Sequence, residues 1–168
     1  MSVNNNVDVI NIMEIIERVE NFAREYDLFK AHDKLLIACS GGPDSMALVD
    51  IFQKLSAKYK LEIIVAHAEH GIRKESSLND AWYVKNYCEQ KNIPFFMEHL
   101  NVLEHLKTEK LSVETLARKL RYQFLRRIAK AQNATKIVTA HHLNDQAETV
   151  LQHLLRGAGT AGLSGMKA

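Results

Sequence analysis

The 168-residue sequence predicts an α/β fold with a doubly wound, mostly parallel sheet. Short apolar runs typical of buried strands alternate along the chain with amphipathic, helix-forming patterns of roughly 12 to 20 residues. Polar clusters also follow three of the expected strands. Because ligands bind at the carboxyl ends of the strands in such sheets, these clusters predict one shared site at that edge.

Each expected element follows from its composition and spacing. Four segments have the apolar or β-branched composition of strands: residues 34–39, 61–67, 93–96 and 136–140. Five segments have helical periodicity: residues 8–26, 43–58, 77–91, 112–132 and 144–156. Residues 98–111 have no clear period and predict a loop with a short turn. Ser112 is expected to cap the helix that follows.

Two of the expected helices predict specific packing. The helix over 8–26 places Ile15, Ile16, Val19 and Phe22 at helical spacing, which favours an amphipathic helix lying on the sheet. In the helix over 77–91 the inward-facing residues are expected to be Trp82, Val84 and Tyr87.

Composition indicates one ordinary globular domain. Hydrophobic residues make up 46% and charged residues 25%, with a net charge of +2, which permits a nucleic-acid partner without arguing for one. Cys39 and Cys88 form no CxxC pair, which disfavours a disulfide scaffold or a zinc site. We expect a cytoplasmic protein with no membrane partner, because no signal-peptide pattern or membrane-spanning apolar run is present.

The stretch LLIACSGGPDS, residues 35–45, is the most informative in the chain. An apolar strand stops at Ser40 and two glycines, and Pro43 suits the first turn of a helix. A strand, a bare loop and a helix N-terminus together favour anion binding, so the stretch predicts a phosphate cradle. An ordinary β–α turn is the alternative, and neither GxxxxGK[ST] nor GxGxxG occurs here.

The clusters after two other strands leave alternatives open. HAEHGIR, residues 67–73, is read as a solvated loop, or with lower weight as a metal site formed by His67, Glu69 and His70 with His141 or His142. In HHLNDQAET, Asp145 and Glu148 share one helix face. Acidic residues in a first helical turn also suit the helix dipole, whereas paired carboxylates can bind an amine and accept its proton.

Basic and glycine-rich segments complete the candidates. ARKLRY places Arg118 and Arg121 three residues apart on a helix, where Arg121 could face phosphate. Arg126, Arg127 and Lys130 are interpreted as surface charge. The glycine-rich stretch over 156–166 is a flexible loop by default and could close over a substrate.

These motifs carry a family resemblance. SGGPDS resembles the SGGxDS loop of the N-type ATP pyrophosphatases, or PP-loop enzymes, which split ATP between its α and β phosphates. With HAEHGIRKESS, ARKLRYQFL, AHHLNDQAET and LLRGAGTAGLSGM in this order, residues 35–166 are similar to the tRNA(Ile)-lysidine synthetase family. The resemblance implies a Rossmann-like PP-loop ATPase domain of the adenine nucleotide alpha hydrolase-like kind.

The resemblance also implies a reaction. Lysine is joined to C2 of cytidine 34 in the CAU anticodon of tRNA(Ile), after ATP adenylates the C2 oxygen. ATP and Mg²⁺ are the implied cofactors, with Asp44 near the metal. The implied nucleotide-binding residues are Ser40, Gly41, Gly42, Pro43, Asp44, Ser45 and His67. The implied catalytic residues are Asp44, Arg121, Asp145 and Glu148. The implied substrate-binding residues are Arg73, Arg118, Arg121, His141, Asp145, Glu148 and Arg156.

Three departures from the family pattern qualify this expectation. Glu69 stands where the family often has Asp, and Asn144 replaces the first Asp of a pair. Family members usually continue into C-terminal tRNA-binding domains. We therefore expect a catalytic domain over 1–155 and a glycine-rich loop with the start of a linker over 156–168, and a homodimer is left open. The rivals are a tRNA thiolase, which the absence of clustered cysteines disfavours, and a non-catalytic nucleotide-binding module.

Overall fold

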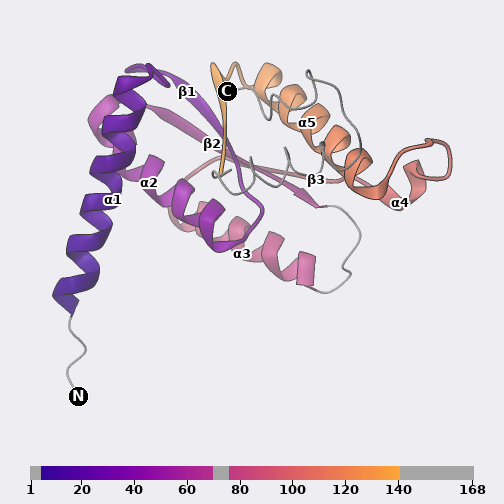
Figure 1. Ribbon diagram of the computed structural model, residues 1–168, viewed down its shortest axis with the longest axis horizontal. Helices are drawn as coiled ribbons and strands as arrows, with labels where there is room; N and C mark the ends of the chain where they lie inside the picture. The colour runs from indigo at the N-terminus through magenta and orange to yellow at the C-terminus, as the bar shows by residue number, and fades with distance from the viewer. Residues whose placement is uncertain (1–4, 70–75, 141–168) are drawn as a thin grey trace, which may run out of the picture.

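The computed structural model describes residues 5–69 and 76–140 as a four-stranded sheet with helices on both faces (Figure 1). The strands are β1 (Lys34–Ala38), β2 (Glu62–Glu69), β3 (Phe95–His99) and β4 (Lys136–Thr139). The helices are α1 (Asn5–Glu25), α2 (Pro43–Tyr59), α3 (Ser76–Gln90), α4 (Val102–His105) and α5 (Val113–Ala131). The predicted α/β class is confirmed.

The sheet is parallel throughout, with strand order β3-β2-β1-β4. Leu36 of β1 is in register with Ile64 of β2 on one side and with Ile137 of β4 on the other. The chain therefore builds outward from β1 to β3 and then crosses back through α5 to the opposite side of β1. This reversal next to β1 is a topological switch point, where doubly wound sheets open a crevice for ligands.

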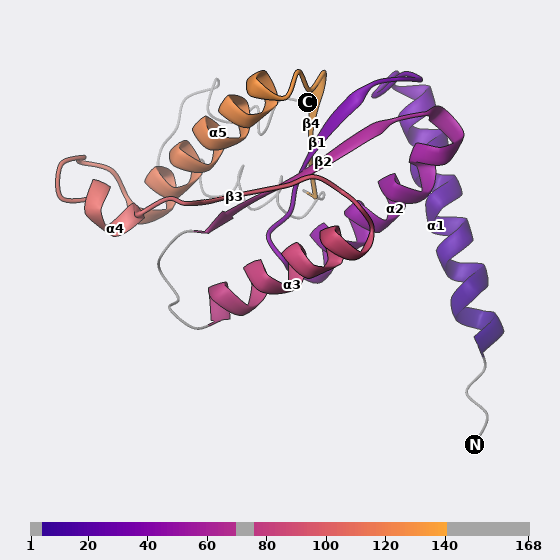
Figure 2. The same ribbon diagram turned by 180° about the vertical axis from the view of Figure 1, so that it is seen from behind.

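Two hydrophobic clusters flank the sheet because successive strand residues point to opposite faces. Leu35 and Ile37 pack with α2 and α3 on one face, and Leu36 packs with α5 on the other. Figure 2 shows the same arrangement from behind, with α2 and α3 below the strands, α5 above them and α4 to the side beyond β3. The three layers fix the ends of β1 and α5 relative to each other.

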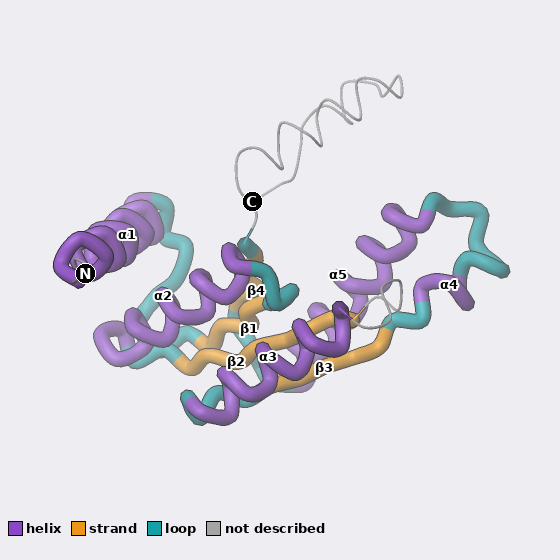
Figure 3. Tube along the Cα trace, turned by 90° about the horizontal axis from the view of Figure 1, so that it is seen from below, coloured by secondary structure: helices purple, strands orange, loops and turns teal. Residues whose placement is uncertain are grey.

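The helix α1 differs from its predicted placement. It packs on α2 instead of covering the strands, and in Figure 3 it lies beyond α2 at the side of the molecule. Ile16 and Val19 reach the core, whereas Ile15 and Phe22 are exposed. A single helix such as α2 presents a narrower apolar surface than a sheet does. It therefore covers only part of the apolar face of α1.

Smaller differences concern Trp82 and the strand ends. Trp82 is 67% exposed and does not face inward, whereas Val84 is fully buried and the half-buried Tyr87 donates a hydrogen bond to Asp50. The strand β2 continues to Glu69, past its expected end at His67, because pairing with β3 extends to Glu69↔His99. The expected strand over 93–96 is observed at Phe95–His99.

The segment before α5 confirms the expected short turn and helix cap. Val102–His105 forms the brief helix α4, and the Ser112 side chain accepts a hydrogen bond from the Thr115 amide at 3.2 Å. The expected helix over 144–156 lies outside the described residues. In the described part of the chain, no helix is long and apolar enough to cross a bilayer.

Candidate active site

The loop after β1 requires glycine at position 41. Gly41 has φ +90°, in the region that side chains rarely adopt. A Cβ atom there would lie 2.8 Å from the Cβ of Asp80 on α3, too close for an unshifted backbone. At Gly42 the nearest atom to such a Cβ is the Ser40 hydroxyl oxygen, at an ordinary 3.6 Å. The first glycine therefore lets the loop pass against α3.

Hydroxyl groups inside the loop hold its shape. The buried Ser45 donates from Oγ to the Gly42 carbonyl at 2.9 Å and accepts from the Ser40 amide at 3.1 Å. The hydroxyl oxygens of Ser40 and Ser45 are 3.1 Å apart. The buried Ser45 thus holds the loop through these hydrogen bonds, while Ser40 is exposed, and both residues line the cavity described below.

The helix α2 begins directly after the loop. Pro43 occupies its first turn, and Gly42 caps it without any side-chain hydrogen bond. Amide groups at such a helix start, together with the positive end of the helix dipole, favour an anion. Asp44 lies in this first turn and is exposed, which suits a carboxylate that meets a hydrated metal bound to phosphate.

A cavity of about 180 Å³ opens beside this loop at the switch point between β1 and β4. Alanines form much of its strand-derived wall, and their small side chains leave room for a ligand. Arg121 and Leu125 reach it from α5, and Thr139 from the end of β4. The residues that line it are Ala38, Cys39, Ser40, Gly42, Pro43, Asp44, Ser45, Ala66, Ala68, Arg121, Leu125, Thr139 and Ala140. The structure thus brings the SGGPDS loop and Arg121 to one cavity.

His67 lies beneath the loop and is not among the residues that line the cavity. Its ring is buried, and Nδ1 is 2.9 Å from the Cys39 carbonyl oxygen, which identifies this nitrogen as the donor. Burial lowers the pKa of His67, against smaller opposing effects of that hydrogen bond and of Asp80 and Glu69. The neutral ring therefore ties the start of the loop to β2, and its expected contact with nucleotide stays a prediction.

The alternative metal site near His67 stays a prediction, because His70, His141 and His142 lie outside the described residues. No group of three or more His, Cys, Asp and Glu side chains in residues 5–69 and 76–140 is arranged to hold a metal ion. The buried Glu69 instead pairs with Nδ1 of His99 on β3. A magnesium ion bound by one carboxylate together with phosphates and water remains compatible with Asp44.

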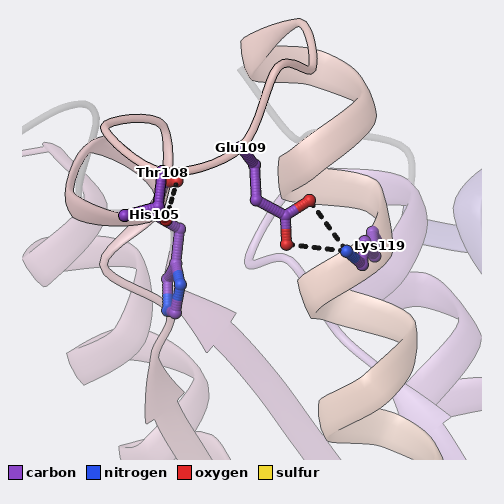
Figure 4. Close-up of polar contacts among 4 residues, drawn as sticks. All are labelled: His105, Thr108, Glu109 and Lys119. Atoms are coloured by element: carbon purple, nitrogen blue, oxygen red, sulfur yellow. Dashed lines mark hydrogen bonds and ion pairs between the residues drawn. The ribbon is translucent and has the colours of Figure 1, made fainter.

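Two arginines of α5 lie near the same aromatic ring. Arg118 and Arg121 have their guanidinium carbons 5.2 and 5.4 Å from the ring centre of Tyr122. Arg121 is half-buried, whereas Arg118 is exposed. Figure 4 shows that Lys119, on the same helix, instead binds both carboxylate oxygens of Glu109.

Three residues at or beside the site were not predicted from the sequence: Thr139 and Leu125, which line the cavity, and Asp80, which lies against Gly41. Thr139 could have been inferred from its place at the end of the last strand. Asp80 and Leu125 gave no signal, because their positions depend on how α3 and α5 pack. Five predicted site residues lie outside the described residues: Arg73, His141, Asp145, Glu148 and Arg156.

Taken together, a parallel sheet, a switch-point cavity and a glycine loop at a helix start define an α/β nucleotide-binding domain. More narrowly, residues 11–168 match the PP-loop domain family, and the chain belongs to that family. The predicted PP-loop assignment is confirmed, and the family implies use of ATP.

Curated relatives narrow the comparison. The chain is 42% identical over 156 residues to a tRNA(Ile)-lysidine synthase from Thermosipho africanus, covering 93% of the chain and 36% of the relative. It is 39% identical over 154 residues to one from Clostridium tetani, covering 92% and 33%. For one from Petrotoga mobilis the figures are 39% over 155 residues, covering 92% and 50%. The chain thus spans half or less of the length of these relatives.

Solved structures share the fold. The U34-tRNA thiolase NcsA from Methanococcus maripaludis, with its [4Fe-4S] cluster, has a TM-score of 0.75 at 17% identity, covering 89% of this chain and 52% of that one. The NH3-dependent NAD synthetase from Campylobacter jejuni has a TM-score of 0.57 at 17% identity, covering 89% and 61%. At these identities the likeness concerns architecture alone.

Proposed function

We propose that this chain carries the ATP-dependent catalytic chemistry of a tRNA(Ile)-lysidine synthase. The observation that carries the proposal is the convergence of the SGGPDS loop and Arg121 on one cavity, in a chain 39–42% identical to three enzymes of that name. The proposed substrates are ATP, free lysine and a tRNA(Ile) with a CAU anticodon. The proposed products are lysidine at position 34, AMP and pyrophosphate.

In the first step, the C2 oxygen of the cytidine attacks the α phosphate of ATP, and pyrophosphate leaves. The loop amides around Gly41 and Gly42 and the N-terminus of α2 bind the departing phosphates. Arg121 is placed to stabilise negative charge on the nucleotide or to orient the target base. Asp44 would hold Mg²⁺, which supplies positive charge to the phosphates when bound.

In the second step, the lysine side-chain amine attacks C2 and AMP leaves, so a C–N bond replaces the C–O bond. The amine is a nucleophile only when neutral, and it therefore needs a group that accepts its proton. We assign that role to Asp145 and Glu148, with His141 beside them. Arg73, Arg118 and Arg156 are proposed to bind substrate.

The remaining expectations stay predictions. They are the catalytic domain over 1–155, the glycine-rich loop and linker start over 156–168, the direct contact of His67 with nucleotide, the cytoplasmic location and a homodimer.

The rival function, a tRNA thiolase, is disfavoured by the chemistry of the two cysteine thiols, which are both buried and form no disulfide. Burial raises the pKa of Cys39, and it raises the pKa of Cys88 to about 12, so neither is a ready thiolate.

The test is incorporation of labelled lysine into a tRNA(Ile) transcript with a CAU anticodon, with and without ATP. The Thermosipho africanus relative serves as the positive control, and a transcript with a changed anticodon serves as the negative one. We expect ATP-dependent incorporation into the first transcript alone. If the relative incorporates lysine while this chain neither incorporates it nor releases pyrophosphate, the proposal is wrong.

A further inference from the structure

Tyr122 is a half-buried aromatic residue that packs in neither hydrophobic cluster of the described residues. Its ring instead has two guanidinium groups near it, those of Arg118 at 5.2 Å and Arg121 at 5.4 Å from the ring centre. Both distances lie within the range of cation–π attraction, about 6 Å. Among the described residues, the Tyr122 ring therefore contacts two guanidinium groups and belongs to neither hydrophobic cluster.

The two arginines have different positions relative to the cavity. Arg121 lines it, and Arg118 lies outside it and is exposed. Within residues 5–69 and 76–140 neither guanidinium forms an ion pair with a carboxylate. Like charges three residues apart on a helix repel, and the negative face of the ring offsets that repulsion.

Lys119 provides the contrast within the same helix. Its Nζ lies 2.7 and 2.8 Å from the two carboxylate oxygens of Glu109 (Figure 4). That pairing fixes the ammonium group and also neutralises its charge. An aromatic ring can restrain a guanidinium without cancelling its charge, so the ring contact leaves Arg121 able to attract an anion.

We propose that Tyr122 is a positioning residue that holds the Arg121 guanidinium at the cavity before a nucleotide binds. The inference rests on the proposed function, because it takes the cavity to be the ATP site. An arginine restrained in advance loses less conformational freedom on binding than a free one. The ring carries this role, and the Tyr122 hydroxyl does not.

A double-mutant cycle with calorimetric binding of α,β-methylene-ATP tests the proposal. Y122M removes the ring and keeps a helix-forming side chain of similar length, with Y122L as a second variant should Y122M fail to fold. Y122F keeps the ring and removes the hydroxyl. R121Q and the double variant R121Q/Y122M complete the cycle, and K119Q removes a cation that is not at the ring. Thermal unfolding of each variant shows that it is folded.

We expect Y122M to weaken analogue binding by about 3- to 10-fold. In the R121Q background the same change should alter affinity by less than about twofold, because the group that Tyr122 positions is gone. Y122F and K119Q should stay within about twofold of the unsubstituted chain. Independent, additive losses from Y122M and R121Q would overturn the proposal, as would an equal loss in Y122F.

The outcome separates this inference from the proposed function. A chain that binds the analogue but forms no lysidine contradicts the proposed reaction, while the cycle still decides the role of Tyr122. Additive losses in a chain that forms lysidine contradict the role of Tyr122 alone. A chain that does not bind the analogue contradicts both.

Discussion

Gly41 is the residue whose backbone geometry most constrains the loop. Its φ is +90°, and a Cβ atom added at this position would lie 2.8 Å from the Cβ of Asp80, so a side chain is excluded there without a shift of the backbone. We expect Gly41→Ala to lower the free energy of unfolding by about 2 kcal/mol, because the strained angle and the contact must both be accommodated. Urea unfolding measures the change.

Gly42→Ala is the matched control for this prediction. Gly42 has φ −72°, and an added Cβ meets only the Ser40 hydroxyl oxygen at 3.6 Å. Its loss of stability should therefore be clearly smaller than that of Gly41→Ala. Equal losses in the two variants would mean that contact with α3 does not set the loop conformation.

Because His67 is buried, we expect the free energy of unfolding to depend on pH. Burial lowers the pKa of the folded-state ring below the ordinary value of 6.5, so the unfolded chain takes up a proton first as pH falls. The contribution of His67 is complete above about pH 6.5 and is lost progressively as pH falls below that value. Urea unfolding at pH 7.5 and pH 5.5 measures the loss.

The variant His67→Gln isolates this effect. Glutamine can still donate to the Cys39 carbonyl but does not titrate, and all other histidines contribute to both proteins. The variant should lose less stability than the unsubstituted chain between pH 7.5 and pH 5.5. The same loss in both proteins would assign the pH dependence to other groups.

At the scale of elements, the start of α5 matters because that helix carries Arg121. The Ser112 hydroxyl accepts a hydrogen bond from the Thr115 amide. We expect Ser112→Ala to cost about 1 kcal/mol of unfolding free energy, since the first turn loses its cap. Chemical denaturation is the measurement, and Ser112→Asn, which retains a capping oxygen, should lose much less. An equal cost in both variants would show that the cap is not what Ser112 contributes.

The sequence predicted the elements well where a buried face imposed a clear period. Strands β1 and β4, helix α2 and the Ser112 cap lie within a residue or two of their expected places. The prediction was right for the existence of α1 and wrong for its placement and for the inward orientation of Trp82, because periodicity identifies an apolar face without saying what covers it. The extension of β2 to Glu69 depends on pairing with β3, which is not a local property of either segment.

The candidate site was predictable to a similar extent. The SGGPDS loop could be assigned to the carboxyl edge of the sheet from parallel topology, whereas for Arg121, on a helix, contact with phosphate was one of two interpretations; the structure places both at one cavity. The alanine wall and the approach of Asp80 to Gly41 could not, because they follow from how strands and helices pack in three dimensions. The roles of Asp145 and Glu148 stay predictions, since they lie outside the described residues.

At the scale of the whole molecule, the strand order explains why the site lies where it does. The central strand β1 has β2 on one side and β4 on the other; β1 leads through α2 to β2, and β4 is reached from β3 through α5 on the opposite face. The loop from β1 and the residues at the end of β4 then face each other across the crevice. Helix α5 closes this crevice with Arg121 because it forms the crossover that leads into β4.

The most direct measurement of the central claim is the identity of the products formed from ATP. The chain is incubated with ATP, lysine and the CAU-anticodon transcript, and the nucleotide and phosphate products are separated. We predict AMP and pyrophosphate in equal amounts, and a drop to background in Asp44→Ala, which removes the carboxylate expected at the phosphates. Formation of ADP and phosphate instead, or undiminished release of pyrophosphate by Asp44→Ala, would contradict the account.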